Sequence, residues 1–337
     1  MRIFVCKYVT GGGIADMPLP RTLQHEGDMT LRALVRDLSA IGGVTLLVAR
    51  DTRLLSPRLP GTPVPVASRD DCWQVWAEAI SAADAVWPVA PETGGLLQRL
   101  SQLVIDSGKT LLGCRPKAVR LCGNKLETAA HLAGHGIAVV PTQPLTANVV
   151  RNLPDAVGGW VVKPNDGAGA ADTYLVTNRE ALASFQAAAP VHQNWIVQPF
   201  RLGAAVSLCL LCRDRDASLL SCNCQHVALA SGRFRYQGWT VGGGDARRAA
   251  YEPIAKKQLP HRARPVWICW RRSYRRERRA SGIGGQSPAH HLICRPARCD
   301  CHQPGRTCAR PGLDLRPMMI VGAGLAKSPR WHCGIAR

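Results

Sequence analysis

One lysine stands where a strand would meet a glycine-rich turn, an arrangement that suits the binding of nucleotide phosphates. Lys163 lies in the stretch GWVVKPNDGAG (159–169), after an apolar run and before a turn that contains Asp166, Gly167 and Gly169. An ammonium group neutralises phosphate charge, and the N–H groups of such a loop can close over phosphate oxygens. The same pattern also describes a buried strand that ends in a hairpin turn, so neighbouring motifs have to decide between the two.

A second lysine is predicted to open a helix. Lys125 follows Asn124 in the stretch LCGNKLETAAHLAGHGIAVVPT (121–142). Asn124 is a good N-cap, and Gly134 or Gly136 would end the helix. A cation in a first helical turn opposes the helix dipole, which hints that a ligand explains Lys125. A short strand is predicted next, at 137–140.

The first part of the chain predicts a doubly wound α/β unit. Apolar runs indicate strands, apolar residues at helical spacing indicate helices, and the two alternate along the chain. The Pro-rich residues 51–70 are interpreted as a loop. The predicted strands are 3–9, 44–48, 85–89 and 110–112, and the predicted helices are 30–38, 73–83 and 96–107.

The residues that follow predict an α+β arrangement. An apolar strand ends in WIVQPF (195–200), and three further strands are expected to be consecutive and antiparallel, at 206–211, 218–220 and 232–240. A helix is predicted at 178–187. Two cysteine pairs, 209/212 and 222/224, suggest a zinc site. We disfavour zinc because the first pair lies inside an apolar strand, whose alternation directs the two side chains to opposite faces.

Two features after the early strands are candidates for ligand binding. Gly11–Gly13 follows the first strand and would cradle phosphate in a dinucleotide-binding oxidoreductase, but the spacing is not that of a GxGxxG motif. Glu92 follows the third strand, at the carboxyl edge where such sheets bind ligands. It is a candidate for substrate binding, and the alternative is an acid favoured at a helix N-terminus.

Composition narrows the class of protein. The chain of 337 residues contains 14 Cys, and it has neither an apolar stretch of membrane-spanning length nor a signal-peptide pattern. We therefore expect a cytoplasmic protein with reduced thiols and no membrane partner. The net charge is +20, but residues 256–337 hold 18 Lys and Arg against 3 Asp and Glu, which leaves +5 for residues 1–255.

Three motifs in order resemble those of the ATP-grasp superfamily. They are GNK at Lys125, VVKP at Lys163 with DGAG after it, and VQPF at Gln198. The resemblance covers residues 1 to about 250, and the chain looks most like the branch that includes tyramine–glutamate ligase of methanofuran biosynthesis. It implies that Lys125 and Lys163 contact ATP phosphates.

The resemblance also implies the rest of the nucleotide site and the reaction. Asp166, Gly167 and Gly169 would belong to a mobile phosphate cover, and Gln198, Pro199 and Phe200 would line the adenine. ATP and Mg²⁺ would be the cofactors. The implied reaction joins a small carboxylic acid to an amine through an acyl phosphate, in a closed site where charge is neutralised and water is excluded.

The implied domain order is a Rossmann-like pre-ATP-grasp domain (1–115), an ATP-grasp N-terminal subdomain (116–195) and a partial C-terminal subdomain (196–255). The family places its carboxylate and Asn ligands for Mg²⁺ in a late segment similar to E-x-N-P-R. No such segment stands in residues 256–337, whose three acidic residues lack that context.

Residues 256–337 have the composition of a coding sequence translated out of frame, and such a composition favours disorder. In the frame that starts at the second base of each codon, Trp267 and Trp270 must both become Gly, because Trp has a single codon. Permitted codons then allow GSVGVDLI over 267–274 and LEVNPRLTTSY over 283–293, which would supply the missing segment. We therefore predict a frameshift near 256–260.

The same tail offers three other patterns, which we disfavour. Scattered His and Cys residues between His290 and Cys308 match no regular zinc spacing. The arginine run 271–279 could bind nucleic acid. A nucleic-acid-binding protein with a basic tail is therefore the alternative function, and we favour the ligase, which has no nucleic-acid partner, over it. GAGLAKS, which starts at Gly322, is half of a P-loop without its strand.

Overall fold

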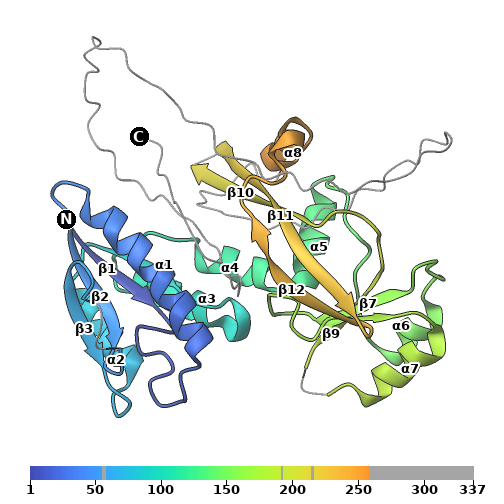
Figure 1. The fold of residues 1–337 in the computed structure, drawn as a ribbon, viewed down its shortest axis with the longest axis horizontal. Coiled ribbons are helices and arrows are strands. Elements are labelled where there is room, and N and C mark those ends of the chain that lie inside the picture. The colour runs from blue at the N-terminus through green and yellow to red at the C-terminus, as the bar shows by residue number, and fades with distance from the viewer. Residues whose placement is uncertain (55–57, 191–192, 214–215, 258–337) are drawn as a thin grey trace, which may run out of the picture.

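The computed structural model describes residues 1–54, 58–190, 193–213 and 216–257 of the chain. They form a five-stranded sheet followed by a seven-stranded sheet (Figure 1). Four predictions concern positions outside these ranges, apart from residues 256 and 257: the frameshifted tail, the tail zinc site, the arginine-run nucleic-acid site and the half P-loop. No helix among the described residues is long and apolar enough to cross a membrane.

The first sheet is parallel throughout, in the order β3-β2-β1-β4-β5. Its strands are β1 (Arg2–Lys7), β2 (Thr45–Asp51), β3 (Thr62–Val66), β4 (Ala85–Val89) and β5 (Thr110–Leu111). The helices of this part are α1 (Arg21–Ser39), α2 (Cys72–Ser81), η1 (Thr93–Gly95), α3 (Leu96–Asp106) and α4 (Pro116–Gly123). Strand order reverses between β1 and β4, which is the point where open α/β sheets bind ligands.

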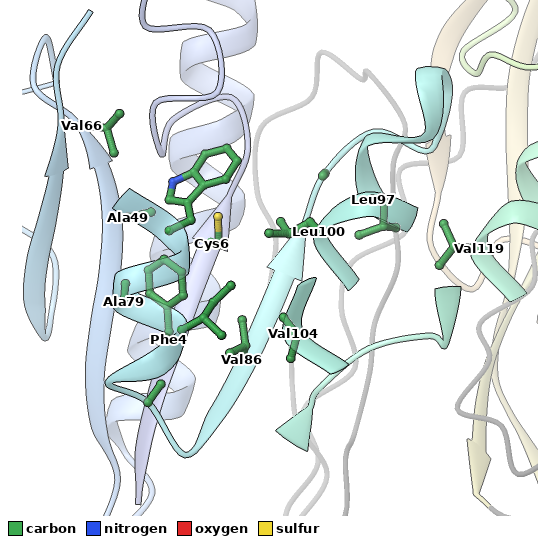
Figure 2. Packing of buried hydrophobic residues seen from close by; sticks show 14 of the residues in the cluster. Phe4, Cys6, Ala49, Val66, Ala79, Val86, Leu97, Leu100, Val104 and Val119 are labelled. Atoms are coloured by element: carbon green, nitrogen blue, oxygen red, sulfur yellow. The ribbon is translucent and has the colours of Figure 1, made fainter. Parts of the chain in front are cut away.

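Helices cover both faces of the parallel sheet because its strands are apolar on both sides. On one face α1 packs against alternate residues of β1 and β2 through Leu31, Val35 and Leu38. On the other face α2 and α3 pack against the remaining strand residues. Figure 2 shows Leu100 and Val104 of α3 lying along β4, which carries Val86, and Leu97 lying nearer to Val119 of α4.

The second sheet has the order β10-β11-β12-β8-β7-β9-β6, and its pairs are antiparallel. Its strands are β6 (Gln143–Pro144), β7 (Trp160–Pro164), β8 (Tyr174–Val176), β9 (Trp195–Pro199), β10 (Val206–Arg213), β11 (Asp216–Ala230) and β12 (Arg233–Thr240). The helices are α5 (Lys125–Gly134), α6 (Ala147–Asn152), α7 (Arg179–Ala188), η2 (Asp245–Arg247) and α8 (Arg248–Lys257). A parallel sheet followed by an antiparallel one confirms the predicted α/β and then α+β fold class.

The seven-stranded sheet consists of two parts joined at one place. Strands β6 to β9 pack on α6 and α7, and β10 and β11 pack on α8 (Figure 1). A single bridge, between Arg233 of β12 and Tyr174 of β8, connects the two parts. The boundary expected between residues 195 and 196 falls inside β9, which pairs with β7.

Two local predictions are wrong. Residues 51–70 are not all loop, since Thr62–Val66 forms β3 along β2. Proline is tolerated there because β3 is an edge strand, where a missing N–H donor breaks no ladder. Residues 137–140 form no strand; the short strand β6 lies later, at Gln143–Pro144, where it pairs with β9.

The triple glycine after β1 serves close packing. A Cβ on Gly11 would lie 2.6 Å from the carbonyl oxygen of Lys7, and one on Gly12 would lie 2.4 Å from Cβ of Val66. Gly12 also has a φ of +98°, and the carbonyl of Gly11 accepts a hydrogen bond of 3.0 Å from Nε1 of Trp76. These contacts explain Gly11–Gly13 without a dinucleotide, so the oxidoreductase alternative loses its motif.

We expect Gly12→Ala to lower the free energy of unfolding by about 3 kcal/mol, because it combines an unfavourable φ with overpacking. Gly43→Ala is the matched control: Gly43 has a φ of +76° but nothing within 4 Å of its Cβ position. It should cost only about 1 kcal/mol. Chemical denaturation of the two variants measures the difference, and equal losses would contradict the packing role.

Candidate nucleotide and substrate site

The ammonium group of Lys125 is enclosed by the turn that follows β7. Its Nζ donates hydrogen bonds to the carbonyl oxygens of Pro164 at 2.9 Å, Asn165 at 3.2 Å and Gly167 at 2.9 Å. All three acceptors come directly after Lys163. The structure therefore brings together the two segments that sequence analysis singled out separately.

The first turn of α5 explains how Lys125 reaches this position. The side chain of Asn124 accepts a hydrogen bond of 2.9 Å from the N–H of Glu127, which confirms the predicted N-cap. Asn165 pairs with the same turn twice: its side-chain oxygen accepts from the N–H of Leu126, and its carbonyl accepts from the N–H of Lys125. Two backbone N–H groups of α5 thus bind Asn165 and join the start of the helix to the residue that follows β7.

The predicted phosphate cover, residues 166–169, continues into a segment of unusual backbone conformation. Gly167, Gly169, Ala170 and Asp172 all have positive φ, of 113°, 66°, 58° and 44°. Cβ atoms on Gly167 or Gly169 would meet nothing within 4 Å, so these glycines serve conformation rather than packing. Two non-glycine residues held at positive φ in one turn point to a functional constraint there.

Backbone donors at the tip of this turn are open to a ligand. Over the described ranges, the N–H groups of Gly167, Ala168 and Gly169 meet no hydrogen-bond acceptor. Successive N–H groups of this kind form concavities that bind anions. The turn therefore offers the donors, and Lys125 the charge, that a phosphate group requires.

Lys163 lies on the face of β7 that α6 and α7 leave uncovered. Trp160 and Val162 point into the core with these two helices, and alternation places Lys163 on the opposite face. The side chain is half-buried, and its cross-strand neighbour is Ile196 of β9.

Gln198, Pro199 and Phe200 lie along and just beyond the end of β9, beside β7. Gln198 pairs with Val161 and donates a hydrogen bond of 2.7 Å from Nε2 to Oγ1 of Thr142. The N–H of Phe200 donates to the carbonyl of Gly159 at 2.9 Å. Through the strand pairing, Gln198 shares the face of the sheet that carries Lys163.

A cavity of about 380 Å³ lies between the two parts of the chain. Asp166, at its wall, accepts a hydrogen bond of 3.3 Å from the N–H of Gly94 in η1, so the phosphate-cover segment touches the first domain. The polar and charged side chains of its lining include Glu92, Gln98, Arg120, Asn124, Asn165 and Asp166. Glu92 therefore belongs to the same site as the glycine turn.

Three charged side chains lie near the edge of the first sheet, and only Glu92 was predicted from the sequence. Burial raises the pKa of the Glu92 carboxyl, and the charge of Lys7 opposes this effect. Burial likewise lowers the pKa of the Lys7 ammonium, against the influence of Glu26 and Glu92. Lys7 and Glu26 gave no sequence signal, because their nearness to Glu92 comes from strand order.

A metal ion requires several ligand side chains close together. In the ranges that the structure describes, no group of three or more His, Cys, Asp or Glu side chains could hold a metal ion. These residues therefore do not supply the carboxylate set that Mg²⁺ prefers. Cys209 is half-buried and Cys222 is buried.

Two known families match different parts of the chain. Residues 44–119 match the family described as pre ATP-grasp 3 domain, and residues 122–259 match the family described as ATP-grasp domain. Together the two matches cover more than half of the chain. The chain belongs to the ATP-grasp superfamily.

Solved structures with a similar fold agree with this assignment. An ATP-grasp superfamily protein from Archaeoglobus fulgidus has a TM-score of 0.55 and 17% identity, over 80% of this chain and 79% of that chain. VanG D-Ala:D-Ser ligase from Enterococcus faecalis has a TM-score of 0.50 and 14% identity, over 76% of this chain and 81% of that chain.

N5-carboxyaminoimidazole synthetase from Staphylococcus aureus, solved with ADP, has a TM-score of 0.51 and 12% identity, over 76% of this chain and 62% of that chain. This ATP-grasp chain thus spans less than two-thirds of the synthetase. No curated protein matches the sequence.

Removing the ammonium of Lys125 should loosen the junction between α5 and β7. We expect Lys125→Ala to cost about 2 kcal/mol of unfolding free energy, because three hydrogen bonds from a charged donor are lost. Hydrogen exchange at the amides of Leu126 and Asn165 should become faster. Lys117→Ala, at an exposed position on α4, is the control and should change neither quantity. Unchanged exchange in Lys125→Ala would contradict the structural role.

Proposed function

We propose that this protein, by family an ATP-dependent ligase, joins a small carboxylic acid to an amine through an acyl phosphate. The observation that carries the proposal is the meeting of Lys125 with the turn after β7, beside a cavity between the domains. A cation and three backbone N–H groups without a hydrogen-bond acceptor among the described residues lie at the same turn there. Electrostatic stabilisation of a transferring phosphoryl group needs this combination.

The proposed reaction has two steps. An oxygen of the acid attacks the terminal phosphorus of ATP, and the bond to the ADP oxygen breaks. The amine then attacks the acyl carbon, a C–N bond forms, the bond to the phosphate oxygen breaks, and the amine loses a proton. Lys125 and Lys163 would neutralise the phosphate charge, and the 166–169 turn would cover the phosphates from water.

The nucleotide would lie on the uncovered face of β7 and β9. Lys163 and Gln198 share this face. Pro199 ends β9 directly after Gln198, and Phe200 follows it. We propose that backbone groups of residues 198–200 line the adenine. This face and the Lys125 turn meet at the end of β7, where Lys163 is followed by Pro164, a partner of Lys125.

We also propose that this copy is impaired. The acidic segment that would hold Mg²⁺ is missing in the frame as written, and permitted codons allow it in the next frame if the shift lies near 256–260. The nucleotide sequence of codons 250–262 tests this directly through a lost or gained base. Assignment to the tyramine–glutamate ligase-like branch of methanofuran biosynthesis belongs to the same proposal, as does a cytoplasmic location.

Weak ATP binding should depend on both lysines. We expect Lys163→Ala and Lys125→Ala each to raise the Kd for ATP at least about tenfold, equivalent to about 1.4 kcal/mol for one lost phosphate contact. Lys117→Ala, which leaves the site intact, should bind as the parent chain does. Isothermal titration calorimetry provides the measurement. Equal affinities of all four proteins would overturn the nucleotide site.

Restoring the reading frame should restore turnover. The chain as written is expected to release no phosphate from ATP above background in the presence of carboxylic acids and amines. The frame-corrected protein should release phosphate in an acid-dependent manner, because it regains the acidic segment that holds the metal. Full ligase activity of the uncorrected chain would contradict the frameshift.

A further inference from the structure

Three charged side chains meet where the strand order of the first sheet reverses. Lys7 ends β1 and pairs with Val89, the last residue of β4. Glu92 follows β4 by three residues, and Glu26 lies on α1. Lys7 is within electrostatic reach of both carboxylates. This crevice is the place where open α/β sheets bind their ligands.

These charges are near one another without being paired. Within the described residues, neither Lys7, Glu26 nor Glu92 takes part in an ion pair or in a hydrogen bond to another side chain. All three side chains are half-buried. Half-buried charges gain much from a partner, so an unpaired set of this kind is suited to a charged ligand.

Helix stabilisation does not explain Glu92. Its side chain makes no capping hydrogen bond at η1, and the first turn of α3 contains no acidic residue. Cβ of Glu92 instead lies 3.7 Å from where a Cβ on Gly123 would be, at the junction of α4 with α5. The carboxylate therefore belongs to the wall of the cavity rather than to a helix end.

The cavity wall is acidic in a protein of net charge +20. Glu92 and Asp166 are the acids of its lining, and Arg120 is the cation. The guanidinium of Arg120 is engaged at 2.8 Å by the carboxylate of Glu127 on α5. Amide side chains such as Gln98 and Asn124 complete the surface, so the wall favours a cation that donates hydrogen bonds.

We infer that this cavity binds the amine substrate, with the carboxylate of Glu92 as its partner. The inference rests on the proposed ligase function and assigns one of its two substrates to a place. A substrate ammonium bound at Glu92 would lie between the first domain and the turn of Asn165 and Asp166, where the carbonyl of Asn165 accepts a hydrogen bond from Lys125. The acceptor is thereby placed beside the proposed phosphate site.

The same carboxylate suits the proton transfer that amide formation requires. The ammonium gives one proton to Glu92, and the resulting neutral amine attacks the acyl carbon. The C–N bond forms as the bond from carbon to the phosphate oxygen breaks, and the leaving phosphate takes up the second proton of the nitrogen. Burial raises the pKa of Glu92, which makes it a better acceptor for that proton than an exposed carboxylate.

Saturation-transfer difference NMR on the full chain tests the site with three probes of one shape. They are 2-phenylethylamine, 2-phenylethanol and 3-phenylpropionate. The amine should bind measurably more tightly than the alcohol or the acid. Glu92→Gln, which keeps the shape but removes the charge, should raise the Kd for the amine at least about tenfold, the loss of one charged contact. Glu78→Gln, at an exposed position on α2, is the control and should leave it unchanged.

Titration with ATP separates this inference from the ligase proposal. Glu92→Gln should keep the parent affinity for ATP, because it lies outside the phosphate-binding turn. Amine binding that survives Glu92→Gln, or tighter binding of the acid probe, would overturn the amine site while ATP binding stands. A parent chain that binds no ATP would overturn the ligase proposal, and the amine assignment with it.

Discussion

The ammonium of Lys125, held by the carbonyls of Pro164, Asn165 and Gly167, is the interaction on which the site depends. It fixes the first turn of α5 to the end of β7, so a helix and a strand about forty residues apart form one surface. Three backbone carbonyls also compensate a cation that the helix dipole disfavours. Phosphate oxygens would be stronger partners for the same charge than neutral carbonyls.

The turn that Lys125 contacts also touches the first domain. The turn held by Lys125 reaches η1 of the first domain through Asp166 and Gly94, and the cavity opens beside it. Glu92, at the carboxyl edge of the parallel sheet, and the glycine turn of the antiparallel sheet therefore border a common space. A two-substrate reaction requires such an arrangement, because both reacting groups must be held in one place.

Much of the fold could be predicted because its signals are local. Strands β1, β2 and β4 are apolar runs between helices, and the cap of α5 is visible as Asn124. Strand β3 escaped prediction because its two prolines resemble loop, and only its place at the sheet edge makes them tolerable. Residues 137–140 are apolar but have no strand partner, and pairing decides strand formation.

The site was predictable to the extent that it is contiguous in sequence. Lys163 and the glycines after it form a motif by themselves, whereas Lys7 and Glu26 acquire meaning only from the order β2-β1-β4. The packing of Gly12 against Val66 likewise depends on tertiary structure, since Val66 lies on β3. A glycine run after a strand suggested a dinucleotide loop there, although its spacing is not that of GxGxxG.

A crystal structure of the full chain with a non-hydrolysable ATP analogue would test the central claim most directly. We predict that Nζ of Lys125 leaves at least one of its carbonyl partners and lies about 3 Å from a phosphate oxygen. Lys163 should contact the same triphosphate, and the 166–169 turn should lie over it. An analogue bound elsewhere, or one bound while Lys125 keeps all three carbonyls, would contradict the account.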